Sequence, residues 1–410
     1  MNVMNVLTGF PQGVARYLNE AWGRSADARL RQDDNGIGTA EVVHFRPNTC
    51  SLTASQQELL VSIDPARDTA HMASIRGGID PRPTMYRNTM TEPLHVARVH
   101  AIHVIAPDIR VIDLRGVRDR ALPPFSAGAH IDLHLGNGLV RQYSLANDPA
   151  ETHRYVLAVA RDAHGRGGSA FIHDRVRVGD ELHIGAPRNL FGLHEGDGHT
   201  VLIAGGIGIT PLSSMAHALA AQGRSWTLHY AMRDRDHAAC LDMIGDAAMR
   251  SQGNGTVHTY CRAAGDARMD IASIVSAAGP DTHFYCCGSA TMIAAYEAAC
   301  AHLPSAQVHC EHFTPVAAPD LKGGFTVELA RSRKTLQVLE GMTVLDALKA
   351  AGLSVPSSCH EGVCGMCETK VLEGMPDARD SVLTAEEKAA GKTMMVCCSG
   401  ALSRRLVLDL

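Results

Sequence analysis

The sequence lacks the features of several broad classes of protein. It has no run of lysine and arginine and its formal net charge is −5, so neither nucleic acid nor an anionic membrane is an expected partner. No apolar run is long enough to span a bilayer, and the first residues lack the basic and apolar regions of a signal peptide. At 410 residues, with 45% hydrophobic and 20% charged residues, the chain is expected to form two to four globular domains.

The twelve cysteines lack the regular spacing of a disulfide framework, and free thiols suit a reducing cytoplasm. Four of them have a different pattern. Cys359, Cys364 and Cys367 form C-x4-C-x2-C, and Cys397 follows further along the chain, which is the plant-type spacing of a 2Fe-2S cluster. Cys398 is adjacent to Cys397, and neighbouring strand residues point to opposite faces, so only one can face the cluster. The spacing favours Cys397.

Two alternatives to the iron–sulfur site remain open. Structural zinc sites with four cysteines usually combine two C-x2-C pairs, and this chain has one. The cysteines could also be inert core residues. Gly362 and Gly365 favour the cluster, because they allow a tight loop whose backbone N–H groups approach the sulfurs.

The segment around these cysteines has a recognisable order of elements. Phe325–Val338 alternates like a hairpin, and Thr343–Ala351 is expected to be a helix with Thr343 as N-cap and Gly352 after its end. A strand pair, a helix and then the cluster loop resemble a plant-type ferredoxin, a β-grasp fold, over residues 321–410.

Residues 1–92 carry no catalytic motif. They are expected to form a small α+β domain of unknown role, a packing or docking module, that ends in a linker around Gly78–Pro83. Its expected helices are Gly13–Ser25 and Ala66–Ile75, and its expected strands are Glu41–Phe45, Thr49–Ala54 and Glu58–Ile63.

The next region, from Leu94 to about Leu193, alternates like β-structure, with Gly, Pro and Asp between short apolar runs. This pattern predicts a small antiparallel barrel. The expected strands are His95–Ile105, Ile109–Leu114, His130–Leu135, Val140–Leu145, Tyr155–Arg161 and Asp180–Ile184.

Two stretches of the predicted barrel could hold a phosphorylated ring. A Gly-rich turn ends in Gly167, Gly168 and Ser169 and opens a short helix, where bare backbone N–H groups favour an anion. Arg141 can add a charge-assisted contact to the same phosphate, and Tyr143 can lie against a flat ring. Each signal alone is also compatible with an ordinary strand or turn.

Strands and helices alternate from His199 onward, which predicts a parallel sheet. The apolar strand Val201–Ala204 runs into Gly205–Pro211 and a helix to Ala221, and we expect Thr210 as N-cap and Pro211 at the first helical position. This turn suits a pyrophosphate, although it is not a G-x-G-x-x-G motif. Further strands are expected at Ser225–Met232, Thr256–Cys261 and His283–Cys287.

Together these motifs resemble a known family. The barrel and the parallel sheet resemble the two halves of the ferredoxin–NADP reductase superfamily, and a C-terminal plant-type ferredoxin resembles the phthalate dioxygenase reductase family, which includes vanillate demethylase reductases. The expected domains are a flavin-binding β-barrel at 93–197, an NAD-binding α/β domain at 198–314 and a 2Fe-2S ferredoxin domain at 321–410. The resemblance implies FMN, NADH and a Rieske-type oxygenase of aromatic catabolism as transient acceptor.

The resemblance also implies roles for individual residues. It places Ser144 near the reactive nitrogen of the flavin, Cys287 beside the nicotinamide and Phe313 over the flavin, although Cys287 could equally be a buried core residue. Ser289 departs from the family, which usually has proline there. The remaining expected nicotinamide-site residues are Gly206, Gly208, Thr210, Pro211, Arg233 and Gly288.

The cofactor assignments rest on two further observations. No separate adenine-binding segment is present, which favours FMN over FAD. Asp234 and Asp236 near the end of the second nicotinamide-domain strand would repel the 2′-phosphate of NADPH, which favours NADH.

The predicted function is electron transfer from NADH through FMN and 2Fe-2S to an oxygenase or O-demethylase. Nicotinamide gives two electrons together and a cluster takes one at a time, and a flavin, which is stable at both levels, converts one mode to the other. One alternative is the same electron chain serving a cytochrome P450 or another acceptor. The other is a non-catalytic cofactor-binding or interaction protein centred on the N-terminal domain.

Overall fold

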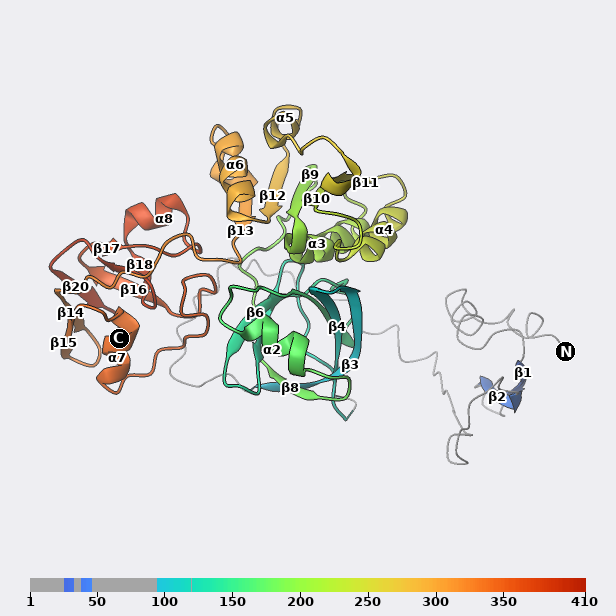
Figure 1. Cartoon of the computed structure of the whole chain (residues 1–410), viewed down its shortest axis with the longest axis horizontal. Helices are drawn as coiled ribbons and strands as arrows, with labels where there is room; N and C mark the ends of the chain where they lie inside the picture. The colour runs from blue at the N-terminus through green and yellow to red at the C-terminus, as the bar shows by residue number, and fades with distance from the viewer. Residues whose placement is uncertain (1–25, 33–37, 46–93, 119) are drawn as a thin grey trace. The chain divides into compact units, whose positions relative to one another are not determined.

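The structure, a computed structural model, describes residues 26–32, 38–45, 94–118 and 120–410. The chain divides into two compact units, Met1–Tyr86 and Arg87–Leu410. In the first unit an antiparallel pair is described, β1 (Ala26–Gln32) and β2 (Gly38–Phe45), and β2 contains the predicted strand Glu41–Phe45 (Figure 1). The other helices and strands predicted for residues 1–92 lie outside the described residues. Within the described ranges, every helix is too short or too polar to cross a lipid bilayer.

The second unit begins with the predicted antiparallel barrel. Its six strands follow the order β6-β5-β8-β3-β4-β7, and just beyond β6 the N–H of Ala146 donates to the carbonyl of Val156 on β7 at 2.9 Å. Alternate strand residues such as Ile131, Leu133 and Leu157 point inward and are fully buried; each stabilises the fold by about 1.5–3 kcal/mol. The elements are β3 (His95–Ala106), β4 (Ile109–Gly116), β5 (His130–His134), β6 (Val140–Ser144), β7 (Arg154–Ala160), α2 (Gly168–Arg175) and β8 (Glu181–Ile184).

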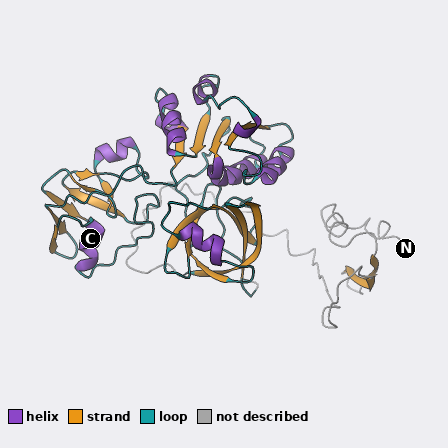
Figure 2. Cartoon of the chain, in the orientation of Figure 1, coloured by secondary structure: helices purple, strands orange, loops and turns teal. Residues whose placement is uncertain are grey.

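The following segment forms the predicted parallel sheet, with helices beside its strands (Figure 2). All four strand pairings are parallel, in the order β11-β10-β9-β12-β13. The strand order reverses between β9 and β12, which is where open α/β sheets bind ligands at their carboxyl edge. The elements are β9 (Thr200–Gly205), α3 (Ile209–Ala221), β10 (Trp226–Met232), α4 (Leu241–Arg250), β11 (Gly255–Cys261), α5 (Ile271–Ser276), β12 (His283–Cys287), α6 (Ala290–Cys300) and β13 (Val308–Glu311).

The start of α3 differs from the prediction. Gly208 is the N-cap, so Thr210 is the second helical residue and Pro211 the third. The cap prediction was wrong because Gly206–Gly208 forms a 3-10 turn that starts the helix early. The Thr210 hydroxyl donates to the Ile207 carbonyl at 3.1 Å instead of accepting from the helix.

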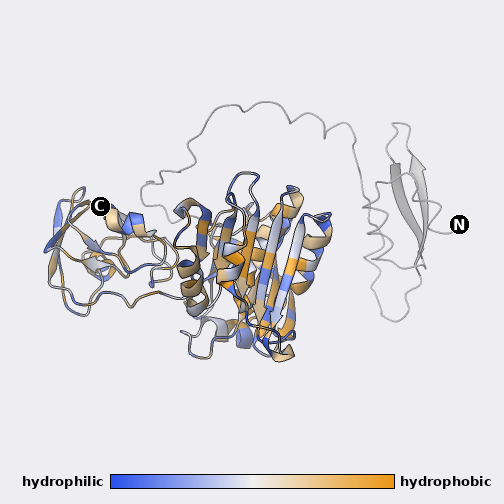
Figure 3. Cartoon of the chain, turned by 90° about the horizontal axis from the view of Figure 1, so that it is seen from above, coloured by the Kyte–Doolittle hydropathy of each residue, from blue (hydrophilic) through white to orange (hydrophobic). Residues whose placement is uncertain are grey.

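The last segment has the β-grasp arrangement, with the sheet order β15-β14-β20-β16-β18. As predicted, Thr343 caps its helix, and its side chain and that of Asp346 satisfy each other's backbone N–H groups. Apolar residues gather on the strands of the second unit, as expected for elements that bury one face (Figure 3). The elements are β14 (Phe325–Leu329), β15 (Lys334–Val338), α7 (Val344–Ala350), β16 (Glu368–Glu373), β17 (Pro376–Asp377), α8 (Ala385–Ala390), β18 (Thr393–Met395), β19 (Gly400–Ala401) and β20 (Arg405–Leu408).

Candidate functional site

The Gly-rich turn of the barrel forms an open cradle at the start of α2. Gly167 caps the helix with φ 82°, a left-handed conformation that favours glycine. A Cβ added to Gly168 would lie 2.5 Å from Cγ of Arg141, so glycine is what lets the Arg141 side chain cross the helix start. Arg141 donates to the carbonyl oxygens of Val140 at 2.8 Å and Arg166 at 3.0 Å.

The charges of the cradle suit an anion. Burial has the largest effect in lowering the pKa of Arg141, followed by the positive charge of the neighbouring Arg166. A bound anion would stabilise the charged guanidinium and offset both effects. The first turn of α2 contains no acidic residue. Ser169 Oγ accepts a hydrogen bond from the Asp162 N–H at 3.0 Å and keeps its own hydrogen available. The donor set therefore fits the phosphate of a flavin mononucleotide.

Beside the cradle, β6 presents Tyr143 and Ser144. Burial raises the pKa of Tyr143 to about 12, so the phenol is neutral at physiological pH. The Ser144 hydroxyl donates to Oε2 of Glu311 at 3.4 Å, which joins the barrel to the end of β13. Glu311 was not among the site residues predicted from the sequence. The signal that could have found it is a carboxylic acid at the end of a strand, two residues before the predicted site residue Phe313.

The Glu311 carboxyl should make stability depend on pH. Burial raises its pKa from 4.5 to about 8, although the side chain keeps some solvent contact. The folded state holds this proton more tightly than the unfolded state does. The protonated carboxyl therefore contributes to the free energy of unfolding in full below about pH 4.5, and this contribution is lost as pH rises through about 8. The melting temperature of the holoprotein should therefore fall between pH 5.5 and 8.5 through this group.

Glu311→Gln should make the free energy of unfolding depend less on pH between 5.5 and 8.5. The slope should change by at most about 1.4 kcal/mol per pH unit. Thermal unfolding across this pH range measures it. Glu195→Gln, at an exposed site, is the matched control and should leave the profile unchanged. Identical profiles for wild type and Glu311→Gln would contradict the assignment.

The predicted nicotinamide residues meet at the carboxyl edge of the parallel sheet. A Cβ on Gly208 would lie 2.3 Å from the carbonyl oxygen of Cys287, so the loops after β9 and β12 touch here. Gly206, with φ 53°, also lies in the loop after β9, and Gly288 directly follows β12. This edge includes the reversal of strand order, which fits a pyrophosphate at the start of α3.

Ser289, the departure from the family pattern, caps α6. Its side chain accepts a hydrogen bond from the N–H of Met292 at 3.3 Å. Serine is among the best N-cap residues, so the exchange of proline for serine keeps the helix start well defined.

Arg233 and Asp234 follow β10 at the same edge. The Asp234 carboxylate contacts Nε of Arg233 at 3.2 Å and Nδ1 of His237 at 2.6 Å, and Arg233 also lies 3.8 Å from Asp108. The hydrogen bond from His237 lowers the pKa of Asp234, so this group stays a carboxylate. Arg233 is thus partly neutralised by two carboxylates.

The two remaining predicted residues differ in exposure. Cys287 is fully buried in an apolar cluster with Tyr285 and Ile209, as a core cysteine would be. Burial raises the pKa of its thiol well above 9. Phe313, after β13, is 39% exposed. Whether either contacts a cofactor stays a prediction.

The cluster cysteines are buried and lie in two pairs. Hydrogen-bonding contact with the Cys359 sulfur, followed by burial, raises the pKa of Cys364, and contact with Cys397 does the same for Cys367. Iron must displace these thiol protons on binding. Two pairs of sulfurs suit two irons, each held by two cysteines.

The pairing argues against the zinc alternative. Four sulfurs around one zinc at about 2.3 Å would all lie roughly 3.8 Å apart. Among the described residues, no three of these sulfurs lie within 4.8 Å of one another.

Cys397 and Cys398 lie in a turn after β18, so the strand alternation expected for them was wrong. The tight turn to the β19 strand ends the extended backbone at Met395. The Cys398 thiol faces the Met395 carbonyl at 3.7 Å and the Ser399 hydroxyl at 3.9 Å. Cys397 as fourth ligand remains a prediction.

The phosphate turn and the cluster loop touch each other directly. Arg166 donates to the Cys359 carbonyl at 3.1 Å and to Oε2 of Glu361 at 2.6 Å. On the neighbouring strand, Gln142 donates to Ser358 Oγ at 2.6 Å. A partly exposed ion pair adds about 1 kcal/mol or less to stability, so its effect here is to orient the two loops. None of these contacts was predicted from the sequence.

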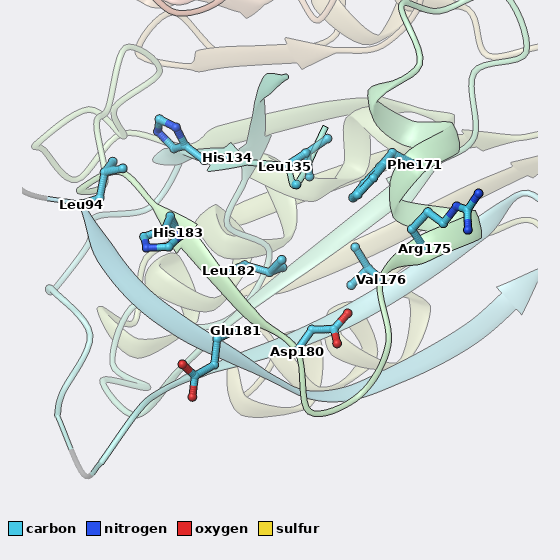
Figure 4. A pocket seen from close by; sticks show the side chains of 11 residues that line it. Leu94, His134, Leu135, Phe171, Arg175, Val176, Asp180, Glu181, Leu182 and His183 are labelled. Atoms are coloured by element: carbon cyan, nitrogen blue, oxygen red, sulfur yellow. The ribbon is translucent and has the colours of Figure 1, made fainter. Parts of the chain in front are cut away.

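A surface pocket of about 510 Å³ lies near the other end of α2 (Figure 4). Leu94, Phe171, Arg175 and His183 are among the residues that line it. No residue predicted for the flavin, nicotinamide or cluster sites belongs to it, so the pocket is separate from those sites.

Comparisons with known families and proteins agree with this geometry. The oxidoreductase NAD-binding domain family matches residues 202–298, and the 2Fe-2S iron-sulfur cluster binding domain family matches residues 327–402. The phenoxybenzoate dioxygenase subunit beta of Ectopseudomonas oleovorans is 51% identical, over 76% of this chain and 96% of that protein. The vanillate O-demethylase oxidoreductase of Acinetobacter baylyi is 39% identical, over 76% and 98%.

Two solved structures are also similar. Phthalate dioxygenase reductase, described as a modular structure for electron transfer from pyridine nucleotides to [2Fe-2S], has a TM-score of 0.57 and 38% identity, over 77% of this chain and 98% of that one. An intact type IV self-sufficient cytochrome P450 monooxygenase has a TM-score of 0.70 and 40% identity, over 80% of this chain and 43% of that one.

These findings confirm the predicted family, its fold and its cofactors, and they exclude the non-catalytic alternative because the relatives are oxidoreductases. The chain belongs to the phthalate dioxygenase reductase family and is an NADH-dependent oxidoreductase that passes electrons through FMN to a 2Fe-2S cluster.

Proposed function

We propose that the chain is the reductase component of an oxygenase system and delivers electrons to a Rieske-type aromatic oxygenase or O-demethylase. The observation that supports electron delivery through the cluster is the contact of Arg166 in the phosphate turn with Cys359 and Glu361 in the cluster loop. The contact joins the predicted flavin-phosphate turn to the predicted cluster loop. The names of the relatives from Ectopseudomonas and Acinetobacter support an oxygenase or demethylase as the acceptor.

The site residues of this proposal are those predicted from the sequence. FMN converts a two-electron donor into a one-electron supply when it is bound. Ser144 would hydrogen-bond near the flavin ring, and Phe313 would cover it. Arg141, Gly167, Gly168 and Ser169 would hold the flavin phosphate, with Tyr143 against the ring. Gly206, Gly208, Thr210, Pro211, Arg233, Cys287 and Gly288 would form the nicotinamide site. Cys359, Cys364, Cys367 and Cys397 would hold the cluster.

An anaerobic NADH titration tests the electron path. The flavin absorbance should bleach, and a paramagnetic signal of a reduced 2Fe-2S cluster should appear. A purified Rieske-type aromatic oxygenase added afterwards should reoxidise the cluster faster than the protein alone does. If the cluster is reduced but no Rieske-type acceptor draws electrons from it, the proposed acceptor class is wrong.

A second candidate function is electron supply to a cytochrome P450. It is favoured by the similarity to the self-sufficient P450 monooxygenase, which this chain matches over 80% of its own length. The same experiment with a purified bacterial P450 separates the two candidates. Reoxidation by the P450 and not by the Rieske-type protein would establish the second.

Asp234 should set the preference for NADH over NADPH. Its carboxylate repels a 2′-phosphate and also engages Arg233, the nearby cation that could hold that phosphate. Asp234→Asn should raise kcat/KM for NADPH roughly tenfold, a change of about 1.4 kcal/mol, and leave kcat with NADH nearly unchanged. Asp281→Asn, at an exposed site just before β12 and at the opposite edge of the sheet, is the matched control. Equal NADPH kinetics in both variants would contradict this role.

We also propose the domain boundaries given above, with residues 1–92 as a separate domain, and a cytoplasmic location. The separate barrel, parallel and β-grasp sheets support the boundaries, and eleven free cysteines among the described residues support a reducing compartment. Limited proteolysis should cut first near residues 93, 198 and 315–320.

Cell fractionation tests the cytoplasmic location. It should recover the protein without periplasmic markers; release with those markers would refute the location.

A further inference from the structure

Three side chains with different metal-binding atoms converge outside the predicted cofactor sites. Glu297 lies on α6, Cys310 on β13, and His312 just after β13. Cys310 Sγ lies 3.9 Å from Glu297 Oε1 and 3.7 Å from His312 Nε2, and the last two atoms are 4.0 Å apart. In the part of the chain that the structure describes, no other three His, Cys, Asp or Glu side chains place their ligand atoms this close together.

The buried Tyr296 holds the two elements that carry this triad in register. Its hydroxyl donates to the Phe284 carbonyl at 2.9 Å and accepts from the N–H of His309 at 3.1 Å. Tyr296 precedes Glu297, and His309 precedes Cys310. The meeting of the carboxylate and the thiol therefore follows from the packing of the core and not from a chance surface contact.

The spacing of the donor atoms is close to that of a tetrahedral ion. Zinc bond lengths of about 2.3 Å to sulfur and about 2.0–2.1 Å to nitrogen and oxygen separate the ligand atoms by roughly 3.3–3.6 Å. The observed separations are longer by roughly 0.1 to 0.7 Å, and the largest excess is between the His312 nitrogen and the Glu297 oxygen. The Glu297 side chain is 55% exposed and can close that gap by rotation.

A simple hydrogen bond explains the triad less well. The contacts of the Cys310 sulfur at 3.7 and 3.9 Å lie at the long end of the range for a thiol. Lys388, whose charge acts on His312, donates from its ammonium group to the Asp380 carbonyl at 2.6 Å.

We propose that Glu297, Cys310 and His312 form a site for a divalent cation of the zinc class. One sulfur, one nitrogen and one oxygen suit zinc, whereas magnesium and calcium prefer oxygen ligands only. Three protein ligands leave the fourth position for water. A bound ion would connect α6 to the end of β13 through Cys310 and His312, the two residues that flank Glu311. The zinc site does not depend on which acceptor the protein serves.

Zinc titrated into the purified holoprotein tests the proposal by calorimetry and zinc-edge X-ray absorption. We expect one zinc bound with a single sulfur ligand at the zinc–sulfur distance of about 2.3 Å, and unchanged iron content. Glu297→Gln and Cys310→Ser should each weaken binding at least tenfold, and Cys310→Ser should remove the sulfur signal. Cys261→Ser and Glu195→Gln are the matched controls and should bind as the wild type does.

Three results would overturn the site. They are zinc bound with no sulfur ligand, zinc bound with four sulfurs at the expense of iron, and wild-type affinity in Cys310→Ser. Dye-linked NADH oxidation by Glu297→Gln should equal that of the wild type, which shows that a loss of zinc binding in this variant does not reflect misfolding.

Discussion

Replacing Cys397 with serine should abolish the 2Fe-2S cluster while the flavin is still reduced by NADH. Cys397 is the predicted fourth ligand, and its sulfur lies against that of Cys367 in one of the two buried pairs. Without it one iron loses a thiolate, and electron transfer through the cluster to cytochrome c should fall by roughly a hundredfold or more. Loss of the paramagnetic signal of the reduced cluster, with flavin bleaching retained, is the measurement.

Cys398→Ser is the matched control, because it changes the adjacent thiol in the same turn. The Cys398 thiol faces the Met395 carbonyl, the Ser399 hydroxyl and the Cys397 sulfur, and a serine hydroxyl can replace the first two contacts. The cluster signal should persist in this variant. If Cys398→Ser loses the cluster and Cys397→Ser keeps it, the fourth ligand is Cys398.

Arg141→Gln should weaken FMN binding through the phosphate alone. Arg141 crosses the start of α2 at Gly168, and in the described part of the chain its side chain donates only to backbone carbonyls, so its charge is available to an anion. A charge-assisted hydrogen bond contributes about 1.5–3 kcal/mol, so FMN affinity should fall about tenfold to 150-fold. Riboflavin, which lacks the phosphate, should bind with unchanged affinity.

Flavin fluorescence titrations of flavin-depleted protein measure both affinities. Arg175→Gln, at the exposed opposite end of the same helix, is the matched control and should behave as the wild type. Equal losses for FMN and riboflavin would indicate damage to the ring site and would contradict a phosphate role for Arg141.

Local patterns were sufficient for most of the fold of residues 94–410. The predicted hairpin Phe325–Val338 and the Thr343 cap were confirmed because alternation and capping depend on residues close in sequence. Helices α4 and α5 and strand β13 were not predicted, since none carries a motif and each depends on packing against the sheet for its definition.

The two local errors share a cause. Thr210 was expected to cap α3, and Cys397 with Cys398 were expected in a strand. At Gly206–Gly208 and after Met395 the backbone makes a tight turn that the residue types did not predict. Hydrogen-bond partners from neighbouring segments decide where such turns begin and end, and a single sequence does not contain them.

Short motifs were enough to predict the 2Fe-2S cluster, because ligand spacing is a property of a short segment, and FMN and NADH followed from the family that the motifs together resemble. How the barrel, the parallel sheet and the ferredoxin segment meet depends on long-range packing. Ser144 reaches Glu311 across 167 residues, and Arg166 reaches Glu361 across 195. Such contacts depend on how segments far apart in the sequence pack, and each is too weak to leave a pattern in either segment alone. The Glu297, Cys310 and His312 triad arises in the same way, from the packing of α6 on β13.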